Sequence, residues 1–433
     1  MPGTAYVRRE GLHLAHRVVG AGTTVAFLPG WVSHVDLLWT DPGSAALLDR
    51  LASFGRLVVL DPRGTGGSDR VPDAELPALE ERAADVLAVL DAIGTRRAVL
   101  LGVGTGCATA AFLAAARPER VAGLVLYAPF PRTSWAEAPL EELAPSRADD
   151  EAFRTWWTAL LSGAAAPATA RALAAADASV EIEPALSAVR VPTLVLVRAG
   201  DRVVDPAAAR RAAAAIPGSR LAHLPGEDHL PLAGDPGPLA GAVEAFVADL
   251  APAASGTAGG TVGLERAFRS VLASEVVSSS TRAVQMGDHR WMSALEAHAT
   301  IARWHLPRFR GAEVESLGRR FVAAFDGPAA ALRFARTVAA AARPRGVEVR
   351  AGVHAGAIDI TGDPGGAGGA GGGPVVHLAE RAAERARAGE VLATDVVRGL
   401  LPGSGLRLQE RGVHDLAGAK GGTRLYAVTG DDR

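Results

Sequence analysis

The feature that most constrains the fold is an alternation of short apolar runs with alanine-rich stretches over the first 250 residues. The runs are rich in Val and Leu, which is typical of strands buried on both faces. They are Val25–Leu28, Leu57–Leu60, Ala98–Val103, Gly123–Ala128 and Thr193–Val197. Helical stretches such as Ala83–Ile93 and Ala108–Ala116 separate some of them. Strands that alternate with helices predict an α/β domain with a mostly parallel sheet covered on both faces.

Residues 133–187 interrupt this alternation. They are predicted to form several helices, and Trp135, Trp156 and Trp157 lie among them. A helical insertion of this kind indicates a cap over a ligand pocket, and the alternative is a packing subdomain whose tryptophans belong to the core. The strand pattern then resumes, so we expect a first domain at 1–250 with a cap at about 133–187.

A second domain is predicted after a linker. Residues 251–262, APAASGTAGGTV, are small and uncharged, which is typical of linkers. Residues 263–433 contain both kinds of pattern, so we expect a mixed α+β domain. The expected strands are Ser270–Val277, Phe321–Phe325 and Val347–Val353, and the expected helices lie at about 291–306, 329–341 and 376–388.

Length and composition support two domains and exclude several classes of partner. A chain of 433 residues is too long for one ordinary core. The net charge of −2 gives no electrostatic basis for binding nucleic acid or an acidic membrane. Cys107 is the only cysteine, so neither an intrachain disulfide nor a cysteine zinc site is expected. The N-terminus lacks an apolar signal region, and no apolar stretch reaches membrane-spanning length. We therefore expect a cytoplasmic protein.

One segment of the first domain carries a motif with chemical meaning. Residues 99–106, VLLGVGTG, lead from a predicted strand into a predicted helix. They resemble the G-x-S-x-G turn of the α/β-hydrolases, with Gly102 and Gly106 as the flanking glycines. Gly104 stands where that family carries its nucleophile serine. Glycine has no side-chain oxygen, so no acyl-enzyme can form at this position.

Other segments resemble the same family in the expected chain order. Asp201, after the strand at 193–197, matches the triad carboxylate, and His229 matches the triad histidine. Residues 28–31, LPGW, resemble the oxyanion-hole loop, so the resemblance implies backbone N–H donors at Trp31 and Thr105. Thr105 lies one position past the apex and Cys107 lies inside the helix, so neither is expected to replace the serine. The resemblance implies a pocket for an apolar or ester-like ligand.

The second domain resembles another family. Residues 271–280 (VLASEVVSSS), 313–321 (EVESLGRRF), 349–356 (VRAGVHAG), 376–381 (VHLAER) and 424–428 (RLYAV) follow one another as the motifs of class III adenylate/guanylate cyclase domains do. The resemblance implies a ferredoxin-like α+β domain that dimerises, with an active site shared between two chains.

In that family two aspartates bind two magnesium ions that bridge the triphosphate. Here Glu275 stands at the first metal position, and Arg319, a fixed cation, stands at the second. We therefore expect no metal at this site and no cofactor. We also predict that Glu275 and Arg319 form an ion pair.

The residues that would recognise the nucleotide also differ from the family pattern. The purine-selecting lysine is matched by Glu315, and Lys420, the only lysine, cannot substitute for it. The partnering aspartate aligns near Ala370, and the transition-state asparagine aligns with His377. Arg381 matches the transition-state arginine, and the alternative is an arginine on a helix surface.

These losses favour a regulatory or ligand-binding pseudoenzyme that forms a homodimer or heterodimer through its cyclase-like domain. One enzymatic alternative is a cyclase that is active only with a complementary partner and uses Mg or Mn. A homodimer could not restore both metal positions, because each copy carries Arg319. The other alternative is a weak hydrolase that activates water with His229.

Overall fold

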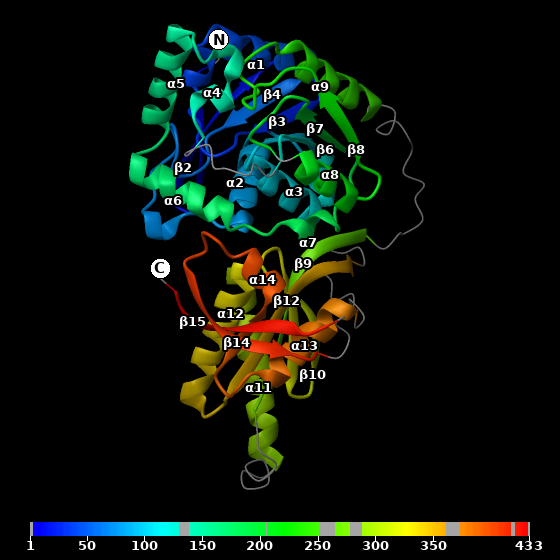
Figure 1. Cartoon of the computed structure of the whole chain (residues 1–433). Coiled ribbons are helices and arrows are strands. Elements are labelled where there is room, and N and C mark those ends of the chain that lie inside the picture. The colour runs from blue at the N-terminus through cyan, green and yellow to red at the C-terminus, as the bar shows by residue number, and fades with distance from the viewer. Residues whose placement is uncertain are drawn as a thin grey trace. The chain divides into compact units, whose positions relative to one another are not determined.

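The computed structural model describes residues 3–129, 138–204, 206–250, 265–277, 288–360, 373–416 and 421–431. The chain divides into two compact units, Met1–Gly259 and Gly260–Arg433 (Figure 1). The predicted linker at 251–262, together with Trp135, Ala370 and Lys420, lies outside the described residues. Within those ranges, no helix combines the length and the apolar character needed to cross a membrane.

The first unit is built on an eight-stranded sheet in the order β1-β2-β4-β3-β5-β6-β7-β8. The strands are β1 (Ala5–Arg9), β2 (Leu12–Val19), β3 (Thr24–Leu28), β4 (Arg56–Leu60), β5 (Ala98–Val103), β6 (Val121–Tyr127), β7 (Thr193–Arg198) and β8 (Arg220–Leu224). Strands β3 to β8 pair in parallel, whereas β1 and β2 are antiparallel to their neighbours. The five strands expected from the sequence correspond to β3 through β7.

Helices cover both faces of this sheet. They are α1 (Pro42–Phe54), α2 (Leu79–Ala92), α3 (Gly106–Ala116), α8 (Pro206–Ala215) and α9 (Gly237–Leu250). Helix α1 contacts α9, and α2 contacts α3. Figure 1 places these two pairs on opposite faces of the sheet. Every residue of α3 is buried, because this helix packs against strands on one side and helices on the other.

The segment between β6 and β7 holds α4 (Leu140–Leu143), η4 (Pro145–Arg147), α5 (Glu151–Ala164), α6 (Pro167–Ala178) and α7 (Glu183–Leu186). Helix α5 begins after Asp150, whose carboxylate accepts the backbone N–H of Phe153 at 3.1 Å. Trp156 and Trp157 of this helix are both buried. The Trp156 indole N–H donates to the Leu37 carbonyl at 2.9 Å, which ties α5 to the loop that follows β3.

The second unit contains a seven-stranded sheet in the order β10-β11-β9-β12-β13-β15-β14. The strands are β9 (Glu265–Val276), β10 (Ala312–Leu317), β11 (Arg320–Phe325), β12 (Val349–Ile360), β13 (Val391–Thr394), β14 (Leu406–His414) and β15 (Thr423–Asp431). Only β12 and β13 pair in parallel. The helices are α11 (Asp288–His305), α12 (Pro328–Ala342), α13 (Pro374–Arg385) and α14 (Asp395–Gly399), with short 3₁₀ turns η6 (Leu306–Phe309) and η7 (Arg343–Arg345).

Helices α12 and α13 pack on opposite faces of this second sheet. Phe334 of α12 contacts Phe321 and Phe325 of β11. Helix α13 belongs to a core cluster with Val322 and Ala324, the intervening residues of the same strand. Successive side chains of a strand point to opposite faces, so the two helices cover different sides.

Candidate active site

The strand-to-helix turn after β5 has the backbone of a nucleophile elbow. Gly104 has φ +53°, in the left-handed region that disfavours L side chains. Its N–H donates to the Tyr127 carbonyl at 2.9 Å, and its own carbonyl accepts from the Cys107 N–H at 3.2 Å. These bonds fix a sharp turn between β5 and α3 of the kind that exposes a nucleophile in α/β-hydrolases. Here the apex carries no side chain.

The two flanking glycines permit close packing of helix against strand. A Cβ on Gly106 would lie 2.4 Å from the Pro29 carbonyl oxygen and 2.5 Å from that of Leu28. A Cβ on Gly102 would lie 2.8 Å from the Cα of Cys107. The neighbouring atoms are backbone, which cannot swing aside as a flexible side chain can, so both positions require glycine.

We therefore expect Gly106→Ala to destabilise the chain by about 1–3 kcal/mol, as overpacked cores are destabilised. Gly241 of α9 provides a matched control, because nothing lies within 4 Å of a Cβ built there. Alanine at this helical position should stabilise the chain by up to about 1 kcal/mol. Urea denaturation compares the two variants, and equal midpoints would contradict the packing argument.

Asp201 and His229 form a buried pair. The His229 Nδ1 lies 2.9 Å from the Asp201 Oδ2, and both side chains are 0% exposed. Asp201 lies three residues after the end of β7, and its Oδ1 accepts the backbone N–H groups of Val203 at 2.9 Å and Val204 at 3.0 Å. The carboxylate is thus held in place to orient the imidazole, and proton exchange with a ligand would use Nε2.

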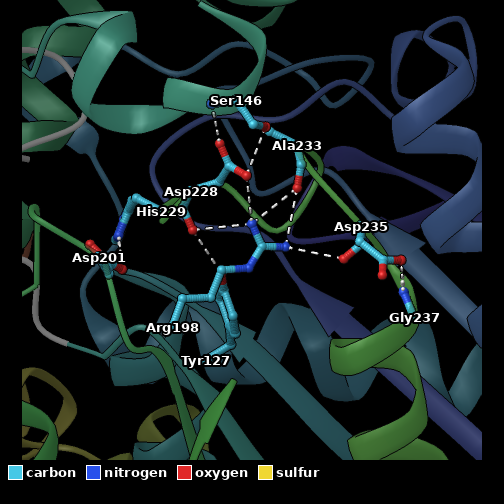
Figure 2. Close-up of polar contacts among 9 residues, drawn as sticks. All are labelled: Tyr127, Ser146, Arg198, Asp201, Asp228, His229, Ala233, Asp235 and Gly237. Atoms are coloured by element: carbon cyan, nitrogen blue, oxygen red, sulfur yellow. Dashed lines mark hydrogen bonds and ion pairs between the residues drawn. The ribbon is translucent and has the colours of Figure 1, made fainter. Parts of the chain in front are cut away.

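A second buried ion pair, which no sequence motif predicted, supports the histidine loop. Arg198, the last residue of β7, pairs with the Asp228 carboxylate at 3.1 Å, and the two side chains are 3% and 5% exposed (Figure 2). Both terminal nitrogens of Arg198 also donate to the Ala233 carbonyl at 3.1 Å. The Tyr127 hydroxyl donates to the Asp228 carbonyl at 3.3 Å. The sequence feature that could have indicated this ion pair is Arg198 itself, a charged residue at the end of an otherwise apolar strand.

Asp228 also connects the histidine loop to the helical insertion. Its Oδ1 accepts the Ser146 backbone N–H at 2.9 Å, and its Oδ2 accepts the Ser146 hydroxyl at 2.8 Å (Figure 2). Ser146 lies in η4, between α4 and α5. The loop that positions His229 is therefore held from β7 on one side and from the insertion on the other.

Trp31 and Thr105, the residues expected to supply the oxyanion-hole N–H groups, line one cavity of about 40 Å³. Leu173 of α6 forms part of the same wall. The Trp31 indole N–H donates to the Ala170 carbonyl of α6 at 2.6 Å, so this side chain links the loop to the insertion. A space of this size holds water but no drug-sized ligand, so a larger ligand requires the insertion to move.

Cys107 does not provide a substitute nucleophile. It is fully buried in α3, and its thiol donates to the Gly102 carbonyl at 3.2 Å. Burial raises the pKa of the Cys107 thiol far above its usual range. The side chain therefore stays a neutral thiol, as its expected position inside the helix implied.

In the second unit, the structure brings Glu275 and Arg319 together. The Arg319 Nε lies 3.3 Å from the Glu275 Oε2, so the predicted ion pair is present. Arg350, which lies in the 349–356 motif but was not predicted as a site residue, donates its Nε to the Glu275 Oε1 at 2.6 Å. Arg350 lies directly opposite Glu275 in the register of β9 and β12. A divalent cation at Glu275 would have to compete with two guanidinium groups.

The predicted site residues of this unit lie in two separate places. Glu275 and Arg319 line a cavity of about 210 Å³ together with Arg320, which pairs with Glu315 at 3.5 Å. His377 and Arg381 lie on α13 and are absent from the described lining of that cavity. Among the described residues, no group of three or more His, Cys, Asp or Glu side chains could hold a metal ion.

Arg381 has partners on its own helix. Its Nη1 pairs with Glu384 at 2.8 Å, and its Nε lies 3.4 Å from the His377 Nε2. The Arg381 side chain is 39% exposed. This arrangement favours the alternative of a helix-surface arginine, and a role toward a nucleotide stays a prediction.

Known proteins match a little over half of this chain. An esterase from Thermogutta terrifontis is 23% identical, with 57% of this chain and 99% of that chain covered and a TM-score of 0.50, which supports the fold. A hydrolase from Pseudomonas aeruginosa is 25% identical, with 56% and 98% covered and a TM-score of 0.48. Est816, described as an N-acyl homoserine lactone degrading enzyme, is 24% identical, with 56% and 100% covered and a TM-score of 0.49. No curated protein matches the chain.

The model of the alpha/beta hydrolase family matches residues 25–243, which is just over half of the 433 residues. This segment runs from β3 into α9 and includes Gly104, Asp201 and His229. The chain therefore belongs to the alpha/beta hydrolase family.

Proposed function

We propose that this chain is a regulatory pseudoenzyme whose hydrolase domain binds a ligand without efficient turnover. The observation that carries the proposal is a glycine at the apex of the elbow, Gly104, in a chain that keeps an intact Asp201–His229 pair. Acyl transfer in this family proceeds through a serine at that position. Loss of the serine from a triad costs about 10⁶-fold in kcat in subtilisin, which indicates the scale of the loss.

The proposed ligand is a small apolar or ester-like molecule. The cavity beside the elbow is lined by Pro29, Trp31 and Leu173, which provide apolar contacts. The N–H groups of Trp31 and Thr105, which line the cavity, would bind a carbonyl oxygen. His229 is 0% exposed and absent from the described lining, so it would bind a polar group of the ligand only after the insertion moves. Each of these interactions is compatible with binding, and none of them requires a nucleophile.

Two assays on the intact chain test the loss of turnover. We expect no hydrolysis of p-nitrophenyl butyrate above the buffer rate, and no cyclic nucleotide from ATP or GTP with manganese. Ester hydrolysis that disappears in His229→Ala would contradict the proposal and establish the weak hydrolase. Cyclase activity that disappears in Arg381→Ala would contradict it in favour of a cyclase.

Binding is tested with the same ester, because a ligand that binds only the folded state raises its melting temperature, and the increase grows with the ligand concentration relative to its Kd. We expect p-nitrophenyl butyrate to raise the melting temperature of the chain. The increase should disappear in Leu173→Arg, which places a charge in the cavity wall. No increase at saturating ester would contradict a pocket for ester-like ligands.

We infer in addition that the second unit is a cyclase-like domain that dimerises with a second copy of this chain. The family resemblance supports dimerisation, and four large apolar side chains of the described part of this unit are exposed, of which Trp304 at 81% and Leu317 at 68% are the most exposed. Light scattering of the intact chain should give the mass of a dimer. Trp304→Ser with Leu317→Ser should give a monomer, and a monomeric unchanged chain would contradict the inference.

The cyclase that needs a complementary partner is the second candidate. A partner chain would supply the metal ligands for Mg or Mn, while this chain would offer Arg381. The contacts of Glu275 with Arg319 and Arg350 argue against metal binding by this chain's own residues. We therefore favour the pseudoenzyme.

A further inference from the structure

A large groove in the second unit lies apart from the cavity at Glu275. It has a volume of about 810 Å³ and is bounded by η6, α12, η7 and the ends of β12, β13 and β15. The two cavities share no lining residue among those described. The volume is within the range of pockets that bind small molecules.

Four arginines line this groove: Arg308, Arg333, Arg336 and Arg343. Arg333 and Arg336 are three residues apart on α12 and therefore lie on one face of the helix. Arg343 follows in η7, and Arg308 comes from η6. Three elements thus bring their guanidinium groups to one groove, although the net charge of the chain is only −2.

The positive charges exceed the negative charges in this groove. The two carboxylates in the lining are Glu348 and Asp431, and the Asp431 Oδ2 pairs with the Arg333 Nε at 3.0 Å. Within the described part of the chain, the guanidinium groups of Arg336 and Arg343 have no ion pair or hydrogen bond. Their donors are therefore available to a ligand.

Several small residues also line the groove. Ala339 and Ala340 lie beside Arg336 on α12, and Ala388 and Gly389 precede β13. Their short side chains occupy little of the groove beside the arginines. Guanidinium groups bind phosphate oxygens with two parallel hydrogen bonds each, and several phosphates in a row would satisfy several arginines at once.

We propose that this groove binds the phosphate chain of a small molecule with two or more linked phosphates. Linked phosphates carry several negative charges close together, and these can pair with the unpaired guanidinium groups that line the groove. This site is independent of the ligand proposed for the hydrolase domain and of the residues that align with a cyclase site.

Isothermal titration calorimetry on the intact chain, without divalent metal, tests the proposal with inorganic tripolyphosphate and with ATP. We expect both to bind at one site per chain, because the phosphates provide the contacts. Arg336→Gln with Arg343→Gln should weaken tripolyphosphate binding at least about tenfold, since two bidentate contacts are lost. The same positions changed to lysine should weaken it less, because lysine keeps the charge but not the paired geometry.

The matched control removes two positive charges elsewhere in the same unit. Arg385→Gln with Arg424→Gln changes two exposed arginines outside the groove lining and lowers the net charge equally. This control should bind tripolyphosphate within about twofold of the unchanged chain. Equal weakening in both pairs would show a general charge effect and overturn the proposal. Absence of tripolyphosphate binding, or binding of ATP alone, would overturn it as well.

Discussion

Gly104→Ser should give the chain esterase activity, with p-nitrophenyl butyrate hydrolysed at least about 100-fold faster than in buffer alone. The backbone at residue 104 already has φ +53°, so serine would enter a turn that needs no rebuilding. The Asp201–His229 pair is intact and would act as the base for the serine. The left-handed conformation should lower stability by about 1–2 kcal/mol, because serine has a Cβ.

Gly104→Ala is the matched control for this gain of activity. Alanine meets the same backbone strain but brings no oxygen, so it should lose similar stability and stay inactive. Gly104→Ser with His229→Ala should also be inactive, since the serine would lack its base. A serine variant that is as stable as the alanine variant, yet inactive, would show that the elbow and His229 are not aligned for catalysis.

The second large effect is expected at the buried ion pair beneath the histidine loop. Arg198→Met should destabilise the first unit by about 3–5 kcal/mol, because it leaves the Asp228 carboxylate buried without its cation. Urea denaturation followed by tryptophan fluorescence measures this, and five of the seven tryptophans lie in the first unit. Arg198→Met with Asp228→Asn should recover part of the loss, since no unpaired charge remains.

The same loop offers a matched control at its surface. Arg202 pairs with Glu227 at 3.3 Å, but these side chains are 68% and 58% exposed. Arg202→Met should change stability by no more than about 0.5 kcal/mol, because water screens an exposed pair. Similar losses in the two arginine variants would contradict the importance of burial for Arg198.

The parallel strands of the first unit could be predicted because each is a continuous apolar run. Strands β1, β2 and β8 were missed, since AYVRR, LHLAHRVV and RLAHL mix charged and apolar residues. These strands lie at or near the sheet edges, where one face or one side meets solvent. In the second unit, β9 begins at Glu265, five residues before the expected Ser270, because polar residues continue the pairing with β12.

The candidate site could be predicted only where motifs fix positions along the chain. Gly104, Asp201 and His229 follow from motif order, and Glu275 with Arg319 follows from a family pattern. The contact of Asp228 with Ser146 joins residues 82 positions apart, and the contact of Arg350 with Glu275 joins residues 75 positions apart. Such pairs depend on tertiary placement and strand register, which no local pattern specifies.

The contact between Ser146 and Asp228 has a mechanical consequence. Ser146 donates two hydrogen bonds to a carboxylate that immediately precedes His229. Hydrogen bonds to a charged group are worth about 1.5–3 kcal/mol each, so η4 and the histidine loop should move as one body. A ligand that displaces the helical insertion at η4 would therefore also move Asp228 and the adjacent His229. In a protein that binds its ligand without turnover, a ligand in the pocket would in this way change the conformation of the histidine loop. A partner protein could recognise that conformation.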